Sequence, residues 1–450
     1  MRTHMRIIIV GGGEVGFGLA QALSLRHEVI VIDQASEAAD RFDKLDIEFI
    51  VGGGTTAETL RRAGIDRADI IIACTGLDEV NIVACGMAHQ LGSPQTICFV
   101  SREDFLGLSE QREGLERFGI DRVVWPEAQL ADDIERIVAT PGAIDAEVFE
   151  QGAIRLVEYR LDSDSPLIEQ TLAELRLPPG SLLVAVRRGD TFFIPRGDTR
   201  LMAGDKAIVM GTAAAMTEVQ RRVTPAAGTG RQRVTIIGGG DVGLRLAERL
   251  DAMKGMELRI IEREQKRGEM LAARLRHALV LNGDGTDLGL LEAEDIGRSD
   301  VLVSVIDNDE KNLLASLLGR QLGVRRIITR VSKPANLRLF ERVGVDVALS
   351  ARGAAVASVL HQVEGGQASL LAVLEEGEGR ILEVQVPPQH DGRTLRELDP
   401  PRDSIVGAIL RPDKAIVPHG TDRLGSGDRL LVFCTRGAAD QVRTFFSPRR

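Results

Sequence analysis

The sequence predicts an α/β protein built by tandem duplication, in which each half has a Rossmann-like doubly wound parallel sheet domain followed by a small α+β lobe. Two observations predict this fold. Near-continuous apolar runs, typical of parallel strands covered on both faces, alternate with helical patterns. The segments at 7–23 and 195–212 also return, in the same order, at 235–250 and 418–435. Gly11 maps onto Gly238 and Pro195 onto Pro418, offsets of 227 and 223 residues, so the repeat unit spans about half of the chain.

The first part of each half carries the parallel-sheet pattern. In the first half we expect strands at 6–10, 28–33, 47–51, 69–74 and 95–100, with a helix at 14–27 after the first strand. A last helix is expected at 126–139, because Pro126 suits the first helical position and Pro141-Gly142 ends the pattern.

The second part of each half looks different. Short apolar strands are expected at 153–161, 181–189, 191–195 and 206–211, joined by polar turns, with one helix around Ile168–Leu175. The second half repeats this lobe at about 369–447. The predicted domains are therefore 5–140, 145–223, 233–358 and 367–448, with a linker at 224–232 between the halves.

Composition excludes several classes of protein. The chain has 450 residues, 44% of them hydrophobic and 27% charged, which is typical of a globular protein and not of a disordered one. A formal net charge of −10 argues against a nucleic-acid partner, since neutralising phosphates requires a basic face. The four cysteines lack metal-ligand spacing, and we expect no metal site. The start of the chain does not resemble a signal peptide and no run is long enough to span a bilayer, so we expect a cytoplasmic protein.

A glycine-rich turn directly after the first strand has the pattern G-x-G-x-x-G, formed by Gly11, Gly13 and Gly16. It opens a helix, and Asp33 ends the next strand about twenty residues on, which is the context of a dinucleotide-binding loop. Glycine lets a diphosphate approach the backbone, and the free N–H groups of a helix start can bind it. The Asp33 carboxylate can accept hydrogen bonds from ribose hydroxyls and would repel a 2′-phosphate, which favours NAD or an adenine nucleotide over NADP.

The second half repeats this arrangement with Gly238, Gly240, Gly243 and Glu262. An alternative interpretation is that the glycines form only tight turns and that the acids are only helix caps. A duplicated copy could also keep the fold and lose its ligand, and this applies more to the second half than to the first.

Further candidates lie at the same edge of each sheet. Gly53 and Thr55 follow the third strand, Asp284 lies in the matching turn of the second half, and Thr75-Gly76 follows the fourth strand. The loop at 52–55 has the alternative interpretation of a flexible loop in which Thr55 caps a helix. Asp78, at the start of the next helix, is interpreted as an N-cap or as a switch or interface residue.

Catalytic groups are not apparent. None of the seven histidines pairs with a nearby Asp in a recognisable frame, and no nucleophile elbow, P-loop or zinc-protease motif occurs. We therefore predict a non-enzymatic nucleotide-binding regulator. An NAD-dependent oxidoreductase and a nucleotide-free scaffold remain as alternatives.

The motifs together resemble the TrkA family of tandem RCK (KTN) proteins over essentially the whole chain. The resemblance is carried by GGGEVG (11–16), VID (31–33), CTGLDEVN (74–81) and PRGDTRLMAGDKAIV (195–209), and by GGGDVG (238–243), IIE (260–262), NGDG (282–285) and VIDNDEKN (305–312). It implies Rossmann and TrkA-C lobes without enzymatic activity. It also implies a ring, a homotetramer, on the cytoplasmic face of the membrane, regulating a TrkH/TrkG-type potassium transporter.

The resemblance further implies that the Rossmann lobes bind NAD or NADH and, in some members, ATP or ADP. The expected cofactor-binding residues are Gly11, Gly12, Gly13, Glu14, Val15, Gly16, Asp33, Gly53, Thr75, Gly76, Gly238, Gly239, Gly240, Asp241, Val242, Gly243, Glu262, Asp284 and Arg330. Basic residues are common on the fifth strand of this family. Here Phe99 and Ser101 take those positions in the first half, whereas the second half retains Arg330.

Overall fold

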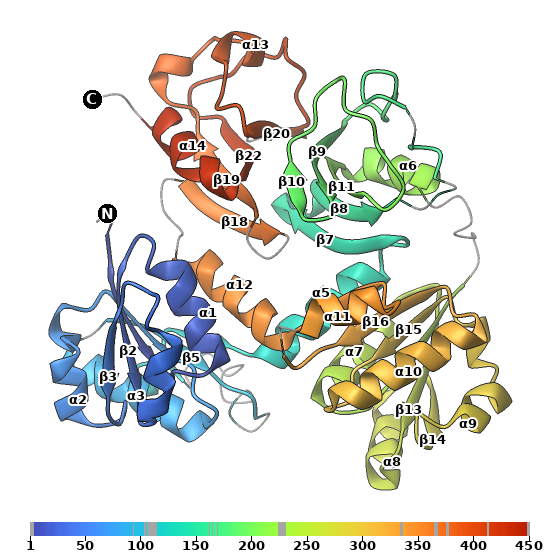
Figure 1. The fold of residues 1–450 in the computed structure, drawn as a ribbon, viewed down its shortest axis with the longest axis horizontal. Helices are drawn as coiled ribbons and strands as arrows, with labels where there is room; N and C mark the ends of the chain where they lie inside the picture. Colours follow the sequence, from blue (N-terminus) through green and yellow to red (C-terminus); the bar gives the residue numbers. More distant parts are fainter. Residues whose placement is uncertain are drawn as a thin grey trace. The chain divides into compact units, whose positions relative to one another are not determined.

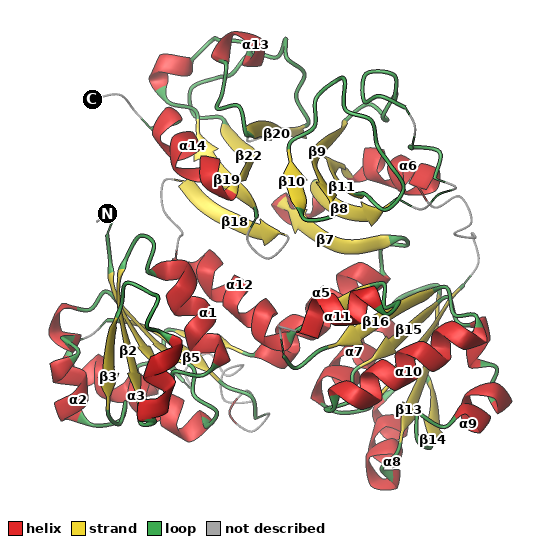
Figure 2. Cartoon of the chain, in the orientation of Figure 1, coloured by secondary structure: helices red, strands yellow, loops and turns green. Residues whose placement is uncertain are grey.

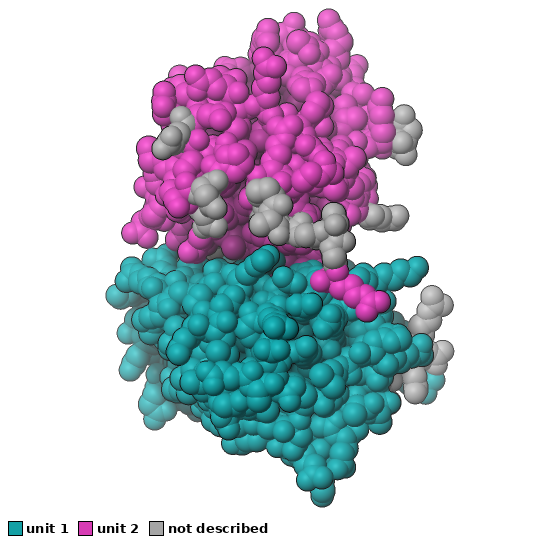
Figure 3. Space-filling view, turned by 90° about the vertical axis from the view of Figure 1, so that its right-hand side faces the viewer, with its two compact units in different colours: residues 1–132, 232–363 teal, residues 133–231, 364–450 magenta. Residues whose placement is uncertain are grey.

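The computed structural model describes most of the chain, as two compact units (Figure 3). It describes residues 4–92, 94–102, 105, 115–161, 163, 165–168, 170–223, 231–333, 336–363, 368–374, 378–411 and 414–447. Residues 1–132 and 232–363 form unit 1, and residues 133–231 and 364–450 form unit 2. Most of the predicted linker at 224–232 lies outside the described residues.

Unit 1 begins with a six-stranded parallel sheet in the order β3-β2-β1-β4-β5-β6 (Figure 1). Ile7, Ile8 and Ile9 on the central strand are fully buried, because helices cover both faces. Strand order reverses between β1 and β4, where an open α/β sheet binds its ligands. The elements of this first lobe are β1 (Arg6–Val10), α1 (Glu14–Leu23), β2 (Glu28–Asp33), η1 (Ser36–Arg41), β3 (Glu48–Val51), α2 (Ala57–Arg62), η2 (Ile65–Arg67), β4 (Ile70–Ala73), α3 (Asp78–Leu91), β5 (Gln95–Phe99), η3 (Glu116–Phe118) and β6 (Arg122–Val124).

The second lobe of unit 1 repeats this topology, with the sheet order β14-β13-β12-β15-β16-β17 and every described pair parallel. Its elements are β12 (Gln232–Ile237), α7 (Asp241–Asp251), β13 (Met256–Glu262), α8 (Gln265–Arg274), β14 (Leu279–Asn282), α9 (Leu288–Ala293), η5 (Ile296–Arg298), β15 (Val301–Ser304), α10 (Asp309–Leu322), β16 (Arg326–Arg330), α11 (Leu337–Arg342), β17 (Val347–Leu349) and α12 (Ala351–Val363). The predicted doubly wound parallel sheets are thus present in both halves.

The two lobes of unit 1 exchange the segments that follow their sixth strands. Helix α12 of the second lobe packs on α1 of the first, where a Cβ placed on Gly18 would lie 3.4 Å from Val356 Cγ2 (Figure 1). In the other direction, the guanidinium of Arg245 on α7 lies 4.4 Å from the centre of the Trp125 ring. Because of this reciprocal packing, the edge of the first sheet that carries its glycine loop lies next to the second lobe.

Unit 2 holds two five-stranded antiparallel sheets in the orders β10-β9-β11-β8-β7 and β18-β19-β22-β20-β21 (Figure 2). Apolar residues of both sheets, including Leu156, Met210, Leu431 and Phe433, form one shared core. The elements are α5 (Pro126–Val138), whose first seven residues belong to unit 1, β7 (Ala143–Phe149), η4 (Glu150–Gly152), β8 (Ile154–Arg160), β9 (Ser181–Arg188), β10 (Thr191–Phe193), β11 (Lys206–Thr212), α6 (Ala213–Val223), β18 (Ala368–Leu374), β19 (Gly379–Gln385), η8 (Pro388–His390), α13 (Leu395–Leu398), β20 (Ser404–Leu410), β21 (Ala415–Ile416), β22 (Arg429–Thr435), η9 (Arg436–Ala438) and α14 (Ala439–Phe445).

The helix expected around Ile168–Leu175 is wrong. In the described part of that segment the chain makes turns, and Thr171 forms an isolated bridge with Arg200. The amide of Leu172 donates to the Thr199 carbonyl at 2.8 Å, so a neighbouring loop takes the hydrogen bond that a helix would use. The strand β7 and the helix α6 were also not predicted from the sequence.

Among the described residues, the helices are all too short or too polar to cross a membrane.

Candidate nucleotide-binding site

The first glycine loop joins β1 to α1 and has the geometry of a phosphate cradle. Gly11 has φ +117°, a conformation that favours glycine. A Cβ on Gly16 would lie 1.8 Å from the Gly11 carbonyl oxygen, so helix and strand can meet this closely only without a side chain. A Cβ on Gly13 would meet nothing within 4 Å. Gly13 therefore faces open space at the start of α1, where a diphosphate could approach the backbone.

The acidic residue after β2 is hydrogen-bonded to this loop. Asp33 Oδ2 accepts the amide of Gly12 at 2.5 Å, and Oδ1 accepts the amide of Ala35 at 2.8 Å. A carboxylate has room for further donors on each oxygen, so these bonds still leave Asp33 able to accept ribose hydroxyls.

The second loop reproduces the first with a longer acid. Gly238 has φ +103°, and a Cβ on Gly243 would lie 1.9 Å from the Gly238 carbonyl oxygen. Glu262 Oε2 accepts the amide of Gly239 at 2.7 Å and Oε1 accepts the amide of Glu264 at 2.7 Å. As at Gly13, a Cβ on Gly240 would meet nothing within 4 Å. Both glycine loops, with their carboxylates, are called cradles below.

A buried asparagine fixes the loops after the fourth and fifth strands. Asn81 Oδ1 accepts the Thr75 amide at 2.8 Å, and its Nδ2 donates to the Phe99 carbonyl at 3.0 Å. In the second lobe Asn312 makes the matching bonds to Ile306 and Arg330, at 2.8 and 3.1 Å. The side chain at each position thus holds two strand ends together at the edge of the cradle.

Asp78 lies in the first turn of α3, but it does not cap that helix as the capping interpretation expected. Its carboxylate accepts the amides of Ser101 and Arg102, at 3.1 and 2.8 Å, and so holds the loop after β5. Asp309 does the same for Ser332 at 2.8 Å. The Thr55 cap was also wrong, because Thr56 accepts the Thr59 amide and caps α2.

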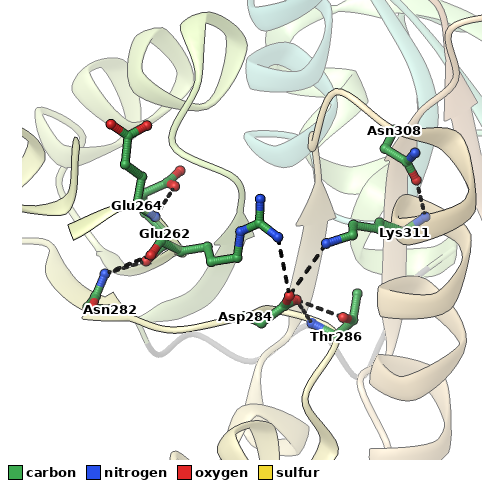
Figure 4. A network of polar contacts seen from close by, with 8 residues as sticks. Glu262, Glu264, Asn282, Asp284, Thr286, Asn308 and Lys311 are labelled. Atoms are coloured by element: carbon green, nitrogen blue, oxygen red, sulfur yellow. Dashed lines mark hydrogen bonds and ion pairs between the residues drawn. The ribbon is translucent and has the colours of Figure 1, made fainter. Parts of the chain in front are cut away.

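Asp284 lies in the turn after β14 and belongs to a polar network beside the second cradle (Figure 4). Its Oδ1 accepts the amide and the hydroxyl of Thr286, at 3.0 and 2.7 Å, and Lys311 Nζ lies 3.5 Å from Oδ2. The Thr286 hydrogen bonds, helped by Lys311, lower the pKa of Asp284. Asn282 Nδ2 donates to the Glu262 carbonyl at 2.9 Å, which ties the turn to the acid of the cradle.

A cavity of about 510 Å³ lies within unit 1, between the first cradle and the second lobe. The first lobe contributes residues from the glycine loop and from the ends of β4 and β5. The second lobe contributes Asp307, Arg330 and Arg352, among others. Arg352 pairs with Glu14, and Arg330 pairs with Asp307 at 2.9 Å.

Known proteins are similar to this chain in sequence and in fold. The family model described as the TrkA-N domain matches residues 7–126 and 234–351, and that of the TrkA-C domain matches 156–224 and 381–447. A Trk system potassium uptake protein TrkA homolog from Methanosarcina mazei is 37% identical, covering 98% of this chain and all of that protein. The Trk system potassium uptake protein TrkA of Halomonas elongata is 31% identical, covering 95% of each chain.

The chain belongs to the TrkA family. Its fold class is the predicted one, with two TrkA-N domains of parallel sheet and two TrkA-C domains. Among solved structures it resembles the GsuK RCK domain, with a TM-score of 0.61 and 22% identity over 99% of this chain and 95% of that one. A GsuK channel bound to NAD matches with a TM-score of 0.61 and 21% identity over 99% of this chain and 79% of that one. At this level of sequence identity, the two matches show only that the folds are similar.

The TrkA-N domains bring together many of the residues that the sequence singled out. The cavity is lined by Gly13, Glu14, Val15, Thr75, Gly76 and Arg330. Asp33 and Gly53 do not line it; Asp33 holds the loop from the β2 side, and the Gly53 carbonyl accepts the Thr56 hydroxyl at 3.1 Å. Arg330 was expected at the second cradle, yet it lines the cavity of the first.

Four charged residues of the cavity were not singled out from the sequence: Arg41, Glu127, Asp307 and Arg352. Glu127 and Arg352 each occupy the second position of the helix that follows the sixth strand, at the ligand-binding edge of the sheet. That position could have indicated from the sequence that both residues lie at the ligand-binding edge. The sequence does not indicate which lobe each residue would face.

Proposed function

We propose that this chain is a regulatory subunit of a potassium-uptake system that binds nucleotides without transforming them. The observation that carries the proposal is the duplicated cradle. In both lobes an open glycine at a helix start is backed by a carboxylate that is hydrogen-bonded to the same loop. Full-length relatives named as Trk system potassium uptake proteins support the physiological role.

The residues of both cradles fit an adenine dinucleotide. Amides at the starts of α1 and α7 would hold the diphosphate, with the helix dipoles adding to the attraction. Asp33 and Glu262 would accept ribose hydroxyls. We propose as cofactor-binding residues all those expected from the sequence, with NAD or NADH and ATP or ADP as ligands. A neighbour of this fold is a channel bound to NAD, which supports the first pair.

The residues around the cavity give little support for a chemical reaction of the bound nucleotide. Cys74 lines it, but burial, together with the Asp33 charge, raises the pKa of that thiol to about 12, so it stays protonated at neutral pH. In the described ranges, groups of three or more His, Cys, Asp or Glu placed to hold a metal are absent. We therefore propose a regulator whose ligands act by preferring one conformation over another.

The family suggests how that preference would reach potassium flux. We propose that the four lobes assemble with those of other copies into a homotetrameric ring on the cytoplasmic face of the membrane. There the ring would act on a TrkH/TrkG-type membrane subunit.

Calorimetric titration of NADH, ATP and ADP into the full chain tests ligand binding. Asp33→Ala should remove one binding event and Glu262→Ala the other, with Asp190→Ala as a control on an exposed turn. Flat titrations with all three nucleotides would support a scaffold instead. Steady NADH consumption with a panel of carbonyl compounds would support an oxidoreductase. Co-purification with a TrkH-type subunit, with and without nucleotide, tests the partner.

A further inference from the structure

A polar pocket lies in the second lobe at a place where the first lobe has an apolar core. The pocket has a volume of about 100 Å³ and lies where β12 and β13 begin and where η5 leads into β15. Because these strands are parallel, this is the edge of the sheet opposite the second cradle. Its lining includes Thr235, Ser299 and three arginines, Arg233, Arg259 and Arg298, and it is called the arginine pocket below.

Three polar residues of the arginine pocket take positions that are apolar in the first lobe. Matching the paired strands of the two sheets makes Thr235 equivalent to Ile8, Arg259 to Ile30 and Ser299 to Ala68. Ile8 and Ile30 are fully buried in the core of the first lobe. Thr235 is also fully buried, and Ser299 is 5% exposed. Polar groups at core positions cost stability unless they have partners, so such replacements are typical of a functional site.

In the first lobe an arginine fills the equivalent space. Arg6 Nη2 donates to the Ala63 carbonyl at 3.2 Å, and the side chain is only 15% exposed. The guanidinium lies against Gly64, where an added Cβ would be 3.0 Å from Arg6 Nη2. The first lobe is therefore closed at this edge because Gly64 leaves room for the arginine.

In the second lobe Asp295 replaces that glycine and keeps its left-handed conformation, with φ +54°. A side chain here conflicts with a guanidinium placed as in the first lobe. Arg259 Nη1 donates instead to the equivalent carbonyl, that of Glu294, at 2.6 Å. Arg233, the equivalent of Arg6, is 50% exposed, and its Nε lies 3.6 Å from Glu257. The second lobe is thus open where the first is closed.

Positive charge exceeds negative charge among the residues that line the arginine pocket. Three arginines accompany two acids, Glu257 and Asp295, which leaves one positive charge. The closest approaches of these acids to arginine nitrogens are 3.6, 3.8 and 3.5 Å, longer than the roughly 2.7–2.9 Å of a charge-assisted hydrogen bond. Exposed pairs of this kind are weak, so an incoming anion could compete with them.

A third acid beside the pocket is common to both lobes. The Asp300 carboxylate accepts the amide of Arg233 at 2.9 Å, as Asp69 accepts that of Arg6 at 2.8 Å. It therefore holds the start of the strand in each lobe and does not account for the pocket of the second.

Two buried hydroxyls add a donor to this lining. Thr235 Oγ1 and Ser299 Oγ lie 2.8 Å apart in a hydrogen bond. One hydroxyl hydrogen makes that bond, so the accepting hydroxyl keeps its own hydrogen to donate. Guanidinium and hydroxyl donors together are the groups that bind oxyanions in proteins.

We propose that the arginine pocket binds a small oxyanion of the size of phosphate. Its volume has room for one such ion or for a few water molecules. Arg233 and Arg259 would donate to the oxyanion from adjacent strands, Arg298 from η5, and the hydroxyl pair from the buried side. The site is separate from the cradles, so this inference does not depend on the proposed nucleotide binding.

Equilibrium dialysis of the full chain with radiolabelled inorganic phosphate, in an excess of sodium chloride, counts the phosphate sites. A variant that carries the first-lobe residues, with Thr235→Ile, Arg259→Ile, Asp295→Gly and Ser299→Ala, should bind one phosphate fewer per chain than the wild type. Comparing the two counts removes any phosphate held by the cradles. Arg62→Gln, on the exposed face of α2, is the control for loss of an arginine and should keep the wild-type count.

A milder variant keeps the test decisive if the four changes together prevent folding. Ser299→Ala leaves every charge in place and removes one buried hydroxyl, so it should weaken phosphate binding at this site about threefold. Thermal melting and NADH titration of each variant show whether the fold and the cradles are intact. The inference would be overturned by a wild type that binds no phosphate, by equal counts in the wild type and the folded first-lobe variant, or by unchanged affinity in Ser299→Ala.

Discussion

The side chain of Asn81 donates a hydrogen bond to the backbone carbonyl of Phe99 at 3.0 Å and so joins the start of α3 to the end of β5. Its oxygen also accepts the amide of Thr75 at 2.8 Å, and Asn81 is only 1% exposed. The strand ends that border the cavity are thus held by one buried amide, which the second lobe repeats with Asn312.

Asn81→Ala should lower the free energy of unfolding by about 2–3 kcal/mol, because it leaves a buried amide and carbonyl without partners. Denaturant titration of the full chain measures this. Gln21→Ala, on the exposed face of α1, is the control and should change stability by less than about 0.5 kcal/mol. A loss at Asn81 no larger than that of the control would mean that water replaces these bonds freely.

Substitutions of Gly13 and Gly16 in the first loop should separate effects on nucleotide binding from effects on folding. Gly16→Ala places a Cβ 1.8 Å from the Gly11 carbonyl oxygen and should cost about 3 kcal/mol or more, because backbone has to move. Gly13→Ala meets nothing within 4 Å and has an extended conformation with φ −70°, so it should fold normally. Its methyl group would occupy the approach of the diphosphate and should weaken nucleotide binding at least about tenfold.

Thermal melting and calorimetry on the same two variants check this pair of expectations. If Gly13→Ala bound nucleotide as the wild type does, the cradle would not be the phosphate site. If it melted early, a side chain at Gly13 would not be tolerated as the open space around it predicts.

The parts of this molecule that follow from local pattern could be predicted from the sequence. The glycine loops, Asp33 and Glu262 each depend on a strand, a turn and a helix that are contiguous in the chain. The placement of Arg352 beside Glu14 could not be predicted, because it depends on how two lobes pack across a separation of 338 residues. Likewise, the turns in the described part of 168–175 depend on a backbone partner at Thr199, which competes with the local helical pattern.

Unit 2 should lose stability as pH rises, because of a half-buried carboxyl group on β7. Burial, followed by the charges of Glu147, Glu158 and Asp133, raises the pKa of Asp145 well above 3.8, and Arg136 opposes this. A raised pKa in the folded state means that the neutral acid is favoured there. The contribution to stability is complete below the ordinary pKa and is lost as pH rises through the raised one.

Asp145→Asn should therefore flatten the fall of the melting midpoint between acidic and neutral pH and raise the midpoint at neutral pH. Asp190→Asn, on an exposed turn, is the matched control and should leave the profile unchanged. A profile for Asp145→Asn that parallels the wild type would show that this carboxyl is solvated.

Trp125 should report nucleotide binding at the contact between the two lobes of unit 1. It is the one tryptophan of the sequence, it directly precedes Pro126 and Glu127 of the cavity, and the Arg245 guanidinium lies 4.4 Å from its ring centre. If a nucleotide bound at the first cradle shifts α12 on α1, the reciprocal contact of Trp125 with α7 should change as well. ATP, which does not absorb in the emission range of tryptophan, should then shift the intrinsic fluorescence with the same midpoint as calorimetric binding.

Arg245→Ala should abolish most of the shift without removing binding, whereas Arg233→Ala, on β12, should preserve it. Calorimetric binding with unchanged Trp125 emission would show that the lobes keep their packing when the ligand binds.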